Sequence, residues 1–120
     1  MKYAILIYGE ESGLADAPQE TVDAVMAEWW GYEGELQKAG AKLAGEALQP
    51  TATGKSVRMA DGKVSVSDGP FAETKEQLGG FYLIEAKDEA EAVEWAAKCP
   101  GSKLGTIEVR PVQEFEAPAQ

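Results

Sequence analysis

The stretches K-Y-A-I-L-I-Y (residues 2–8) and F-Y-L-I-E-A (residues 81–86) decide the fold. Each has an apolar run, such as Ile5, Leu6 and Ile7, where a half-buried strand would alternate apolar and polar residues. A strand without polar alternation is typical of the middle of a sheet, because both of its faces are covered there. The two stretches are therefore predicted to form the middle strands of one sheet.

A helix is expected between the first strand and the next, over residues 18–39, where apolar residues recur at helical spacing. Asp16 followed three residues later by Gln19 resembles a capping box at its start. Gly31 and Gly34 weaken this helix by about 1 kcal/mol each relative to alanine. Their presence indicates that something packs closely against the helix at this point.

A second helix is expected over residues 88–98, because Asp88 and Glu91 form another box-like start. Residues 41–48 alternate only loosely and are interpreted as an edge strand. The last strand is predicted over residues 106–112, where apolar and charged residues alternate.

A hairpin is predicted between the edge strand and the second middle strand. Residues 56–59 and 64–67 flank the dipeptide Asp61-Gly62. This dipeptide favours a two-residue type I′ turn, which requires positive φ at both positions.

The expected element order is β-α-β, hairpin, β-α-β, which is the order of a ferredoxin-like α+β sandwich with an inserted hairpin. In that topology the helices cover one face of the sheet only. The other face would expose apolar side chains as a larger patch than monomers usually show. We therefore expect a homodimer whose two sheets face each other, a dimeric α+β barrel; the alternative is a lone sheet closed by its own hairpin.

The length of 120 residues fits one domain, expected over residues 1–115, with a frayed C-terminal tail over residues 116–120. No apolar run approaches the roughly 20 residues of a membrane span. The N-terminus lacks the basic-then-apolar pattern of a signal peptide. The sequence therefore predicts a cytoplasmic protein.

Composition excludes several kinds of chemistry and partner. The chain has no histidine, which excludes Ser-His and Cys-His catalytic arrangements, and its single cysteine, Cys99, permits no internal disulfide. A formal net charge of −10 disfavours both nucleic acid and anionic membrane surfaces as partners. We expect neither a metal ion nor an organic cofactor.

The stretch S-D-G-P-F-A-E-T-K-E-Q-L-G-G (residues 67–80) contains the candidate catalytic residue, Asp68. An Asp at the first position of a turn accepts hydrogen bonds from backbone amides two residues on, which is a structural role. Alternatively, Asp68 projects into a pocket between sheet and partner, where burial would raise its pKa and suit it to acid–base chemistry. Thr74 and Gln77 resemble a further capping box, which predicts a helical turn over residues 74–78.

Five further residues are candidate ligand-binding residues. Lys75 would neutralise an anionic ligand and Tyr82 would supply a hydroxyl. Arg110 follows Glu108 at the same-face spacing of a strand, so an ion pair or dimer contact is the main interpretation and ligand binding the alternative. The other two lie at strand ends as possible pocket liners: Tyr8 and Glu46. Gly79-Gly80 is interpreted as a bulge or a close backbone contact entering the middle strand.

The run D-G-P-F-A-E-T-K-E-Q-L-G-G-F-Y-L-I-E (residues 68–85) resembles the signature of the YCII-related family, in its DGPF-domain branch. The resemblance extends over nearly the whole chain, through K-Y-A-I-L-I-Y-G, A-G-E-A-L-Q-P, E-W-A-A-K-C-P and I-E-V-R-P-V. It implies a ferredoxin-like fold and a dimeric α+β barrel. Members of this branch are also often encoded beside extracytoplasmic-function sigma factors, which implies a regulatory or stress setting. Some members are similar to cofactor-independent enzymes on the same barrel, and one branch implies an acid–base histidine paired with aspartate, from which this histidine-free chain departs.

Three functions fit these observations. The first is a small homodimer that binds a small ligand in the barrel cavity and has an accessory or regulatory role. The second is a cofactor-independent isomerase, lyase or hydrolase-like enzyme with Asp68 as the acid–base group and Lys75, Tyr82 or Arg110 stabilising negative charge. The third is a protein-interaction module that contacts a sigma factor.

Overall fold

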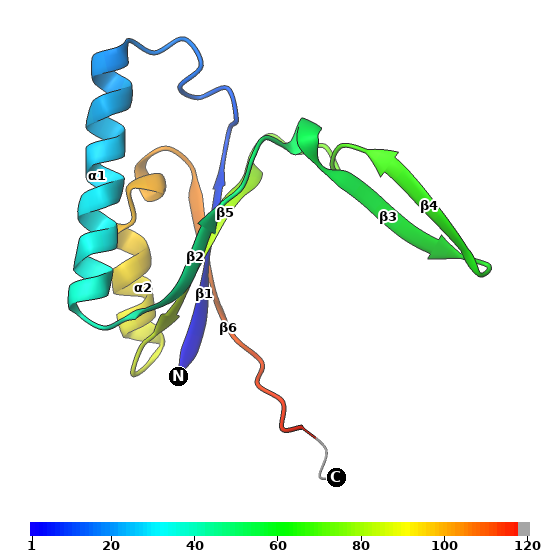
Figure 1. Ribbon diagram of the computed structural model, residues 1–120. Helices are drawn as coiled ribbons and strands as arrows, with labels where there is room; N and C mark the ends of the chain where they lie inside the picture. The colour runs from blue at the N-terminus through cyan, green and yellow to red at the C-terminus, as the bar shows by residue number, and fades with distance from the viewer. Residues whose placement is uncertain (118–120) are drawn as a thin grey trace.

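A computed structural model describes residues 1–117 as a four-stranded sheet with two helices and a separate two-stranded hairpin (Figure 1). Of the expected tail over residues 116–120, residues 118–120 lie outside the described residues. The elements, in chain order, are β1 (Lys2–Gly9), α1 (Gln19–Lys38), β2 (Lys42–Ala47), η1 (Thr51–Thr53), β3 (Lys55–Ala60), β4 (Lys63–Asp68), β5 (Gln77–Glu85), α2 (Glu89–Lys98), η2 (Pro100–Lys103) and β6 (Thr106–Pro111).

The four-stranded sheet has the order β2-β5-β1-β6, and each neighbouring pair is antiparallel. The prediction that the two fully apolar strands lie in the middle is confirmed, because β1 and β5 are those strands. Both helices lie on the same side of the sheet (Figure 1). The architecture is α+β and consistent with a ferredoxin-like fold.

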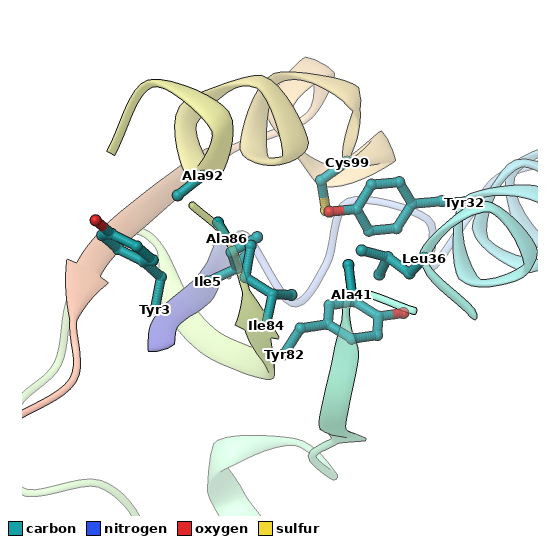
Figure 2. Close-up of a cluster of buried hydrophobic side chains, with 10 residues drawn as sticks. All are labelled: Tyr3, Ile5, Tyr32, Leu36, Ala41, Tyr82, Ile84, Ala86, Ala92 and Cys99. Carbon is teal, nitrogen blue, oxygen red and sulfur yellow. The ribbon is translucent and has the colours of Figure 1, made fainter. Parts of the chain in front are cut away.

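The hydrophobic core lies between the sheet and the helices (Figure 2). Ile5 of β1 pairs with Tyr82 of β5, and both are buried against Tyr32 and Leu36 of α1. The ring of Tyr82 meets the ring of Tyr32 edge-on, with centroids 5.7 Å apart. Edge-on aromatic pairs of this kind add to the stabilisation from apolar burial.

The two helix starts differ from each other. Asp88 caps α2 by accepting a hydrogen bond from the Glu91 amide at 2.9 Å, so that capping prediction is confirmed. The prediction that Asp16 caps α1 is wrong. Pro18 occupies the capping position, no side chain bonds there, and Asp16 lies two residues too early in the preceding turn.

The two glycines of α1 do not mark a close contact within the chain. A Cβ atom at Gly31 or Gly34 would meet no atom of the described chain within 4 Å. No described residue makes the close contact expected there, so close packing at Gly31 and Gly34 stays a prediction for a contact from outside this chain.

The inserted hairpin has the predicted turn. Asp61 and Gly62 have φ angles of 49° and 76°, both in the left-handed region that a type I′ turn requires. The hairpin forms its own sheet and projects from one end of the large sheet, on the side away from the helices (Figure 1).

A bulge marks the start of β5. Ile7 pairs with Gly80 and Tyr8 with Leu78, so Gly79 is the extra, unpaired residue. This confirms the bulge predicted from Gly79-Gly80. The helical turn predicted over residues 74–78 is wrong, because β5 already begins at Gln77. The side-chain amide of Gln77 donates to the Thr74 carbonyl at 2.8 Å, so this carbonyl has a hydrogen-bond partner without a helix.

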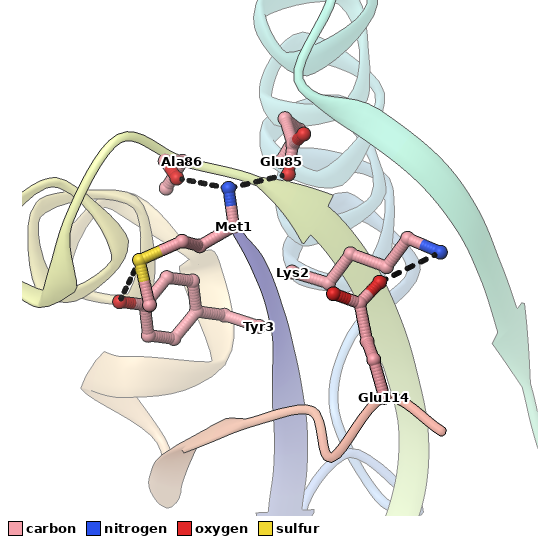
Figure 3. A network of polar contacts seen from close by, with 6 residues as sticks. All are labelled: Met1, Lys2, Tyr3, Glu85, Ala86 and Glu114. Atoms are coloured by element: carbon pink, nitrogen blue, oxygen red, sulfur yellow. Dashed lines mark hydrogen bonds and ion pairs between the residues drawn. The ribbon is translucent and has the colours of Figure 1, made fainter. Parts of the chain in front are cut away.

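The N-terminus is held at the opposite end of the sheet (Figure 3). The Met1 ammonium donates to the Ala86 carbonyl at 3.0 Å and pairs with the Glu85 carboxylate at 3.0 Å. Lys2 pairs with Glu114 at 3.4 Å. These contacts join β1 to the residues that follow β5 and β6.

Substituting Gly80 by alanine is expected to lower the free energy of unfolding by about 1–3 kcal/mol. A Cβ atom there would lie 2.9 Å from the carbonyl oxygen of Glu46, a backbone atom that cannot rotate away. Gly34→Ala is the matched control, because its Cβ meets nothing and alanine favours a helix by up to about 1 kcal/mol. Thermal unfolding at equal protein concentration measures both; equal midpoints for the two variants would contradict the close contact.

Candidate functional site

The side of the sheet away from the helices is the candidate site, and we call it the open face. Paired residues of antiparallel strands share a face, and successive residues of a strand alternate between faces. Because Ile5, Tyr82 and Ile84 face the helices, their neighbours along the strands face the other way. The open face therefore comprises Ala4, Leu6 and Tyr8 of β1, Phe81 and Leu83 of β5, Ala44 and Glu46 of β2, and Thr106, Glu108 and Arg110 of β6.

The open face has an apolar centre and a polar rim. The centre consists of Leu6, its partner Phe81, and Leu83, all in the two middle strands. All three side chains are half-buried. The polar side chains come mainly from the edge strands, as for Glu46 on β2 and Arg110 on β6. An apolar sheet surface with a few polar groups at its margin suits contact with another apolar surface.

Arg110 forms the expected ion pair with Glu108. The guanidinium Nε donates to the Glu108 carboxylate at 3.0 Å, and this hydrogen bond raises the pKa of Arg110. Both side chains lie on the open face. Arg110 is exposed, so its remaining N–H groups face solvent at the rim of the candidate site.

Glu76, in the loop before β5, reaches the open face, which the sequence did not predict. Thr106 pairs with Tyr8 in the sheet, and its hydroxyl donates to the Glu76 carboxylate at 2.8 Å. Glu76, Thr106 and Tyr8 therefore lie together at one end of the open face. No pattern along the chain marks this contact, because the two bonded residues are 30 positions apart.

Tyr82 lies on the helix side of the sheet, away from Tyr8, Glu46 and Arg110. Its hydroxyl donates to Glu33 of α1 at 3.1 Å, and Glu33 also pairs with Lys42 of β2. Burial raises the pKa of Tyr82, and the charge of Glu33 raises it further, so the hydroxyl stays protonated at neutral pH. The contacts among Tyr82, Glu33 and Lys42 link β5, α1 and β2.

Asp68 ends β4 at the base of the hairpin. Its side chain is 84% exposed and pairs with Lys55, the residue opposite it in β3. The predicted hydrogen bond from the backbone amide two residues on is wrong, because that residue is Pro70, which has no N–H to donate. No side chain among residues 1–117 shields the 84% exposed Asp68 carboxylate from water.

Lys75 is 87% exposed in the loop before β5, where it lies 3.7 Å from the Glu10 carboxylate. Of the six candidate residues, the structure therefore brings three to the open face: Tyr8, Glu46 and Arg110. Asp68 and Lys75 lie in separate exposed positions, and Tyr82 is buried on the other face.

Within residues 1–117 no three His, Cys, Asp or Glu side chains are grouped closely enough to hold a metal ion. Neither of the helices formed by these residues is long and apolar enough to cross a membrane. Cys99 is buried in the core, and burial raises the pKa of its thiol.

The chain belongs to the YCII-related family: the model of the YCII-related domain matches residues 1–116. It is 37% identical over 118 residues to an uncharacterised protein of Rhizobium meliloti (strain 1021), covering 97% of this chain and 95% of that one. A solved structure similar in fold is 5-chloro-2-hydroxyhydroquinone dehydrochlorinase from Burkholderia phenoliruptrix, in complex with 2,5-dihydroxybenzoquinone. That match has a TM-score of 0.57 and 16% identity and covers 96% of each chain.

Replacing Glu33 by glutamine is expected to destabilise the protein by on the order of 1 kcal/mol at pH 7 and by less in acid. The hydrogen bond from Lys42 lowers the pKa of Glu33 in the folded state. The contribution of the Glu33 carboxylate to the free energy of unfolding is therefore complete above the unfolded pKa of about 4.3. This contribution is lost as the pH falls through the lower pKa of the folded state.

Denaturant unfolding of both proteins between pH 7 and pH 3 measures this difference. Glu73→Gln is the control, because Glu73 is exposed in the loop before β5. A stability difference for Glu33→Gln that stays constant across this range would contradict the assignment.

Proposed function

We propose that the protein is a small cytoplasmic homodimer that binds a small ligand between two open faces and has an accessory or regulatory role. The observation that supports it is the open face itself, an apolar sheet surface with a polar rim that no part of the described chain covers. A sigma factor remains the partner that the family resemblance implies for the regulatory role.

A second copy is the simplest cover for the open face. The half-buried side chains Leu6, Phe81 and Leu83 form an adjoining apolar group in the two middle strands. Soluble monomers rarely leave a large contiguous apolar patch in contact with water. Two copies related by a two-fold axis would bury the same patch on each other.

A planar hydroxylated ring compound is the ligand class that this surface favours. Phe81 and Leu83 would contact the ring, and the Tyr8 hydroxyl and the Arg110 guanidinium would bind its oxygen atoms. The dehydrochlorinase of similar fold binds 2,5-dihydroxybenzoquinone, which has this chemistry. The similarity supports the choice of compound class at the level of the fold.

The same neighbour is an enzyme, which favours a cofactor-independent enzyme as the second candidate function. In that case the acid–base group would be Asp68. Its side chain is 84% exposed, so a second copy would have to cover it before it could act in a site shielded from water. Ligand binding requires no such change and is the better supported function.

Wild-type protein is expected to bind 2,5-dihydroxybenzoquinone, and Arg110→Gln is expected to weaken binding about tenfold, equivalent to about 1.4 kcal/mol. The physical reason is the loss of a charged donor at the rim of the open face. Isothermal titration calorimetry measures both dissociation constants.

Lys87→Gln is the matched control, because it removes the same charge from the connection between β5 and α2, away from the rim. Equal weakening in the two variants would show a general charge effect and contradict a rim site. Absence of binding by the wild type at millimolar probe would contradict the compound class.

A further inference from the structure

The hairpin β3–β4 has one apolar face that is open to solvent. Val57 pairs with Val66, and Met59 pairs with Val64, so all four side chains lie on the same face. Their exposed fractions range from 60% to 68%. The opposite face is polar, with Arg58 opposite Ser65 and Ser56 opposite Ser67.

Among residues 1–117, no helix or strand outside the hairpin makes extensive contact with it. It forms a two-stranded sheet of its own, and its extensive contacts are those between β3 and β4. An isolated two-stranded hairpin is marginally stable in water. At its base the two strands are joined to each other, where the Gly69 amide donates to the Gly54 carbonyl at 2.8 Å and the Ser56 hydroxyl donates to the Gly69 carbonyl at 2.7 Å. A hairpin held mainly by contacts between its own strands needs a further surface for its apolar face.

The position of the hairpin indicates where that surface lies. The hairpin projects from one end of the large sheet on the side away from α1 and α2, which is the side of the open face (Figure 1). The open face and the hairpin therefore form the two sides of an angle. Any copy that covers the open face lies inside this angle, next to the hairpin.

Charge favours a second copy of this chain as the occupant. The hairpin has three basic residues, Lys55, Arg58 and Lys63, against two acidic ones, Asp61 and Asp68. The whole chain has 11 basic and 21 acidic residues, so the hairpin is slightly basic on a strongly acidic protein. The apolar face itself is neutral, because its two charged residues, Lys55 and Asp68, pair with each other, and Arg58 and Lys63 lie on the polar face. An acidic second copy therefore meets no excess negative charge on the apolar face, and the basic residues of the polar face attract it.

We propose that the hairpin, residues 55–68, is a dimerisation arm whose apolar face packs on the second copy of the chain. This inference rests on the proposed homodimer and extends it by assigning a second contact surface. In a two-fold dimer each copy gives one arm and receives one, so the apolar contact is made twice.

The arm is tested by replacing its valines with threonine in the variant Val57→Thr/Val64→Thr/Val66→Thr. Threonine keeps the β-branched shape and the preference for strands, and it replaces one methyl group with a hydroxyl. Sedimentation equilibrium is expected to show a dimer dissociation constant at least tenfold higher than that of the wild type. The control Ser65→Thr/Ser67→Thr alters the polar face of the same strand and is expected to match the wild type.

The outcomes separate the arm from the dimer. A wild-type dimer whose dissociation constant is unchanged in the triple variant overturns the arm and leaves the open-face dimer in place. A wild type that is monomeric at millimolar concentration overturns both.

If the triple variant does not fold, hydrogen exchange in the wild type decides. Backbone amides of residues 57–66 that become protected as the protein dimerises support the arm, and amides that exchange as fast as in the monomer overturn it.

Discussion

The two middle strands of the sheet, β1 and β5, have apolar side chains on both faces, but the chain supplies helices for only one of them. On the helix side Ile5, Tyr82 and Ile84 are buried against α1 and α2. On the other side Leu6, Phe81 and Leu83 have only their neighbours in the sheet. Burial of apolar area is the main favourable contribution to folding and association. The uncovered apolar face therefore favours association with another apolar surface.

Tyr82 and Tyr8 lie on opposite faces of the sheet and have different contacts. Tyr82 faces α1, where its hydroxyl bonds Glu33, and Glu33 in turn pairs with Lys42. These contacts join the sheet to the helix and keep a charged pair beside a buried ring. Tyr8 faces the opposite way, beside Thr106 and Glu76. The Tyr8 hydroxyl therefore belongs to the open face, and the Tyr82 hydroxyl does not.

The hairpin extends the same reasoning beyond the sheet. It adds a second apolar surface, Val57, Met59, Val64 and Val66, on the side of the molecule that the helices leave open. One occupant would cover both surfaces at once. The apolar face of the hairpin has no net charge and its polar face is basic, so an acidic second copy of this chain fits as the occupant.

Much of the fold could be predicted from local patterns. The middle strands, both helices, the Asp61-Gly62 turn and the Gly79 bulge have signals in neighbouring residues, and all are present. The side of the sheet that Tyr82 faces could not be predicted. A strand that is apolar on both faces has no polar residue to mark the solvent side, and a bulge at its start shifts the alternation by one residue.

The contacts between residues far apart in the chain could not be predicted from local sequence patterns either. Glu76 reaches Thr106 and Glu33 reaches Tyr82 only because strands from different parts of the chain meet. The errors at Asp16 and Thr74 have another cause. A Ser, Thr or Asp followed by Gln three residues later fits a turn or loop as well as a helix start, since these side chains bond nearby backbone in both.

The most direct test of the account is solvent accessibility of the leucine methyl groups, measured by NMR with a soluble paramagnetic agent on leucine-labelled protein. Leu36 is fully buried and Leu104 is 62% exposed, so they calibrate the two extremes. If a second copy covers the open face, the methyl groups of Leu6 and Leu83 relax as slowly as those of Leu36. Relaxation rates of Leu6 and Leu83 that do not change between dilute and concentrated protein, and that lie near the rate of Leu104, would contradict it.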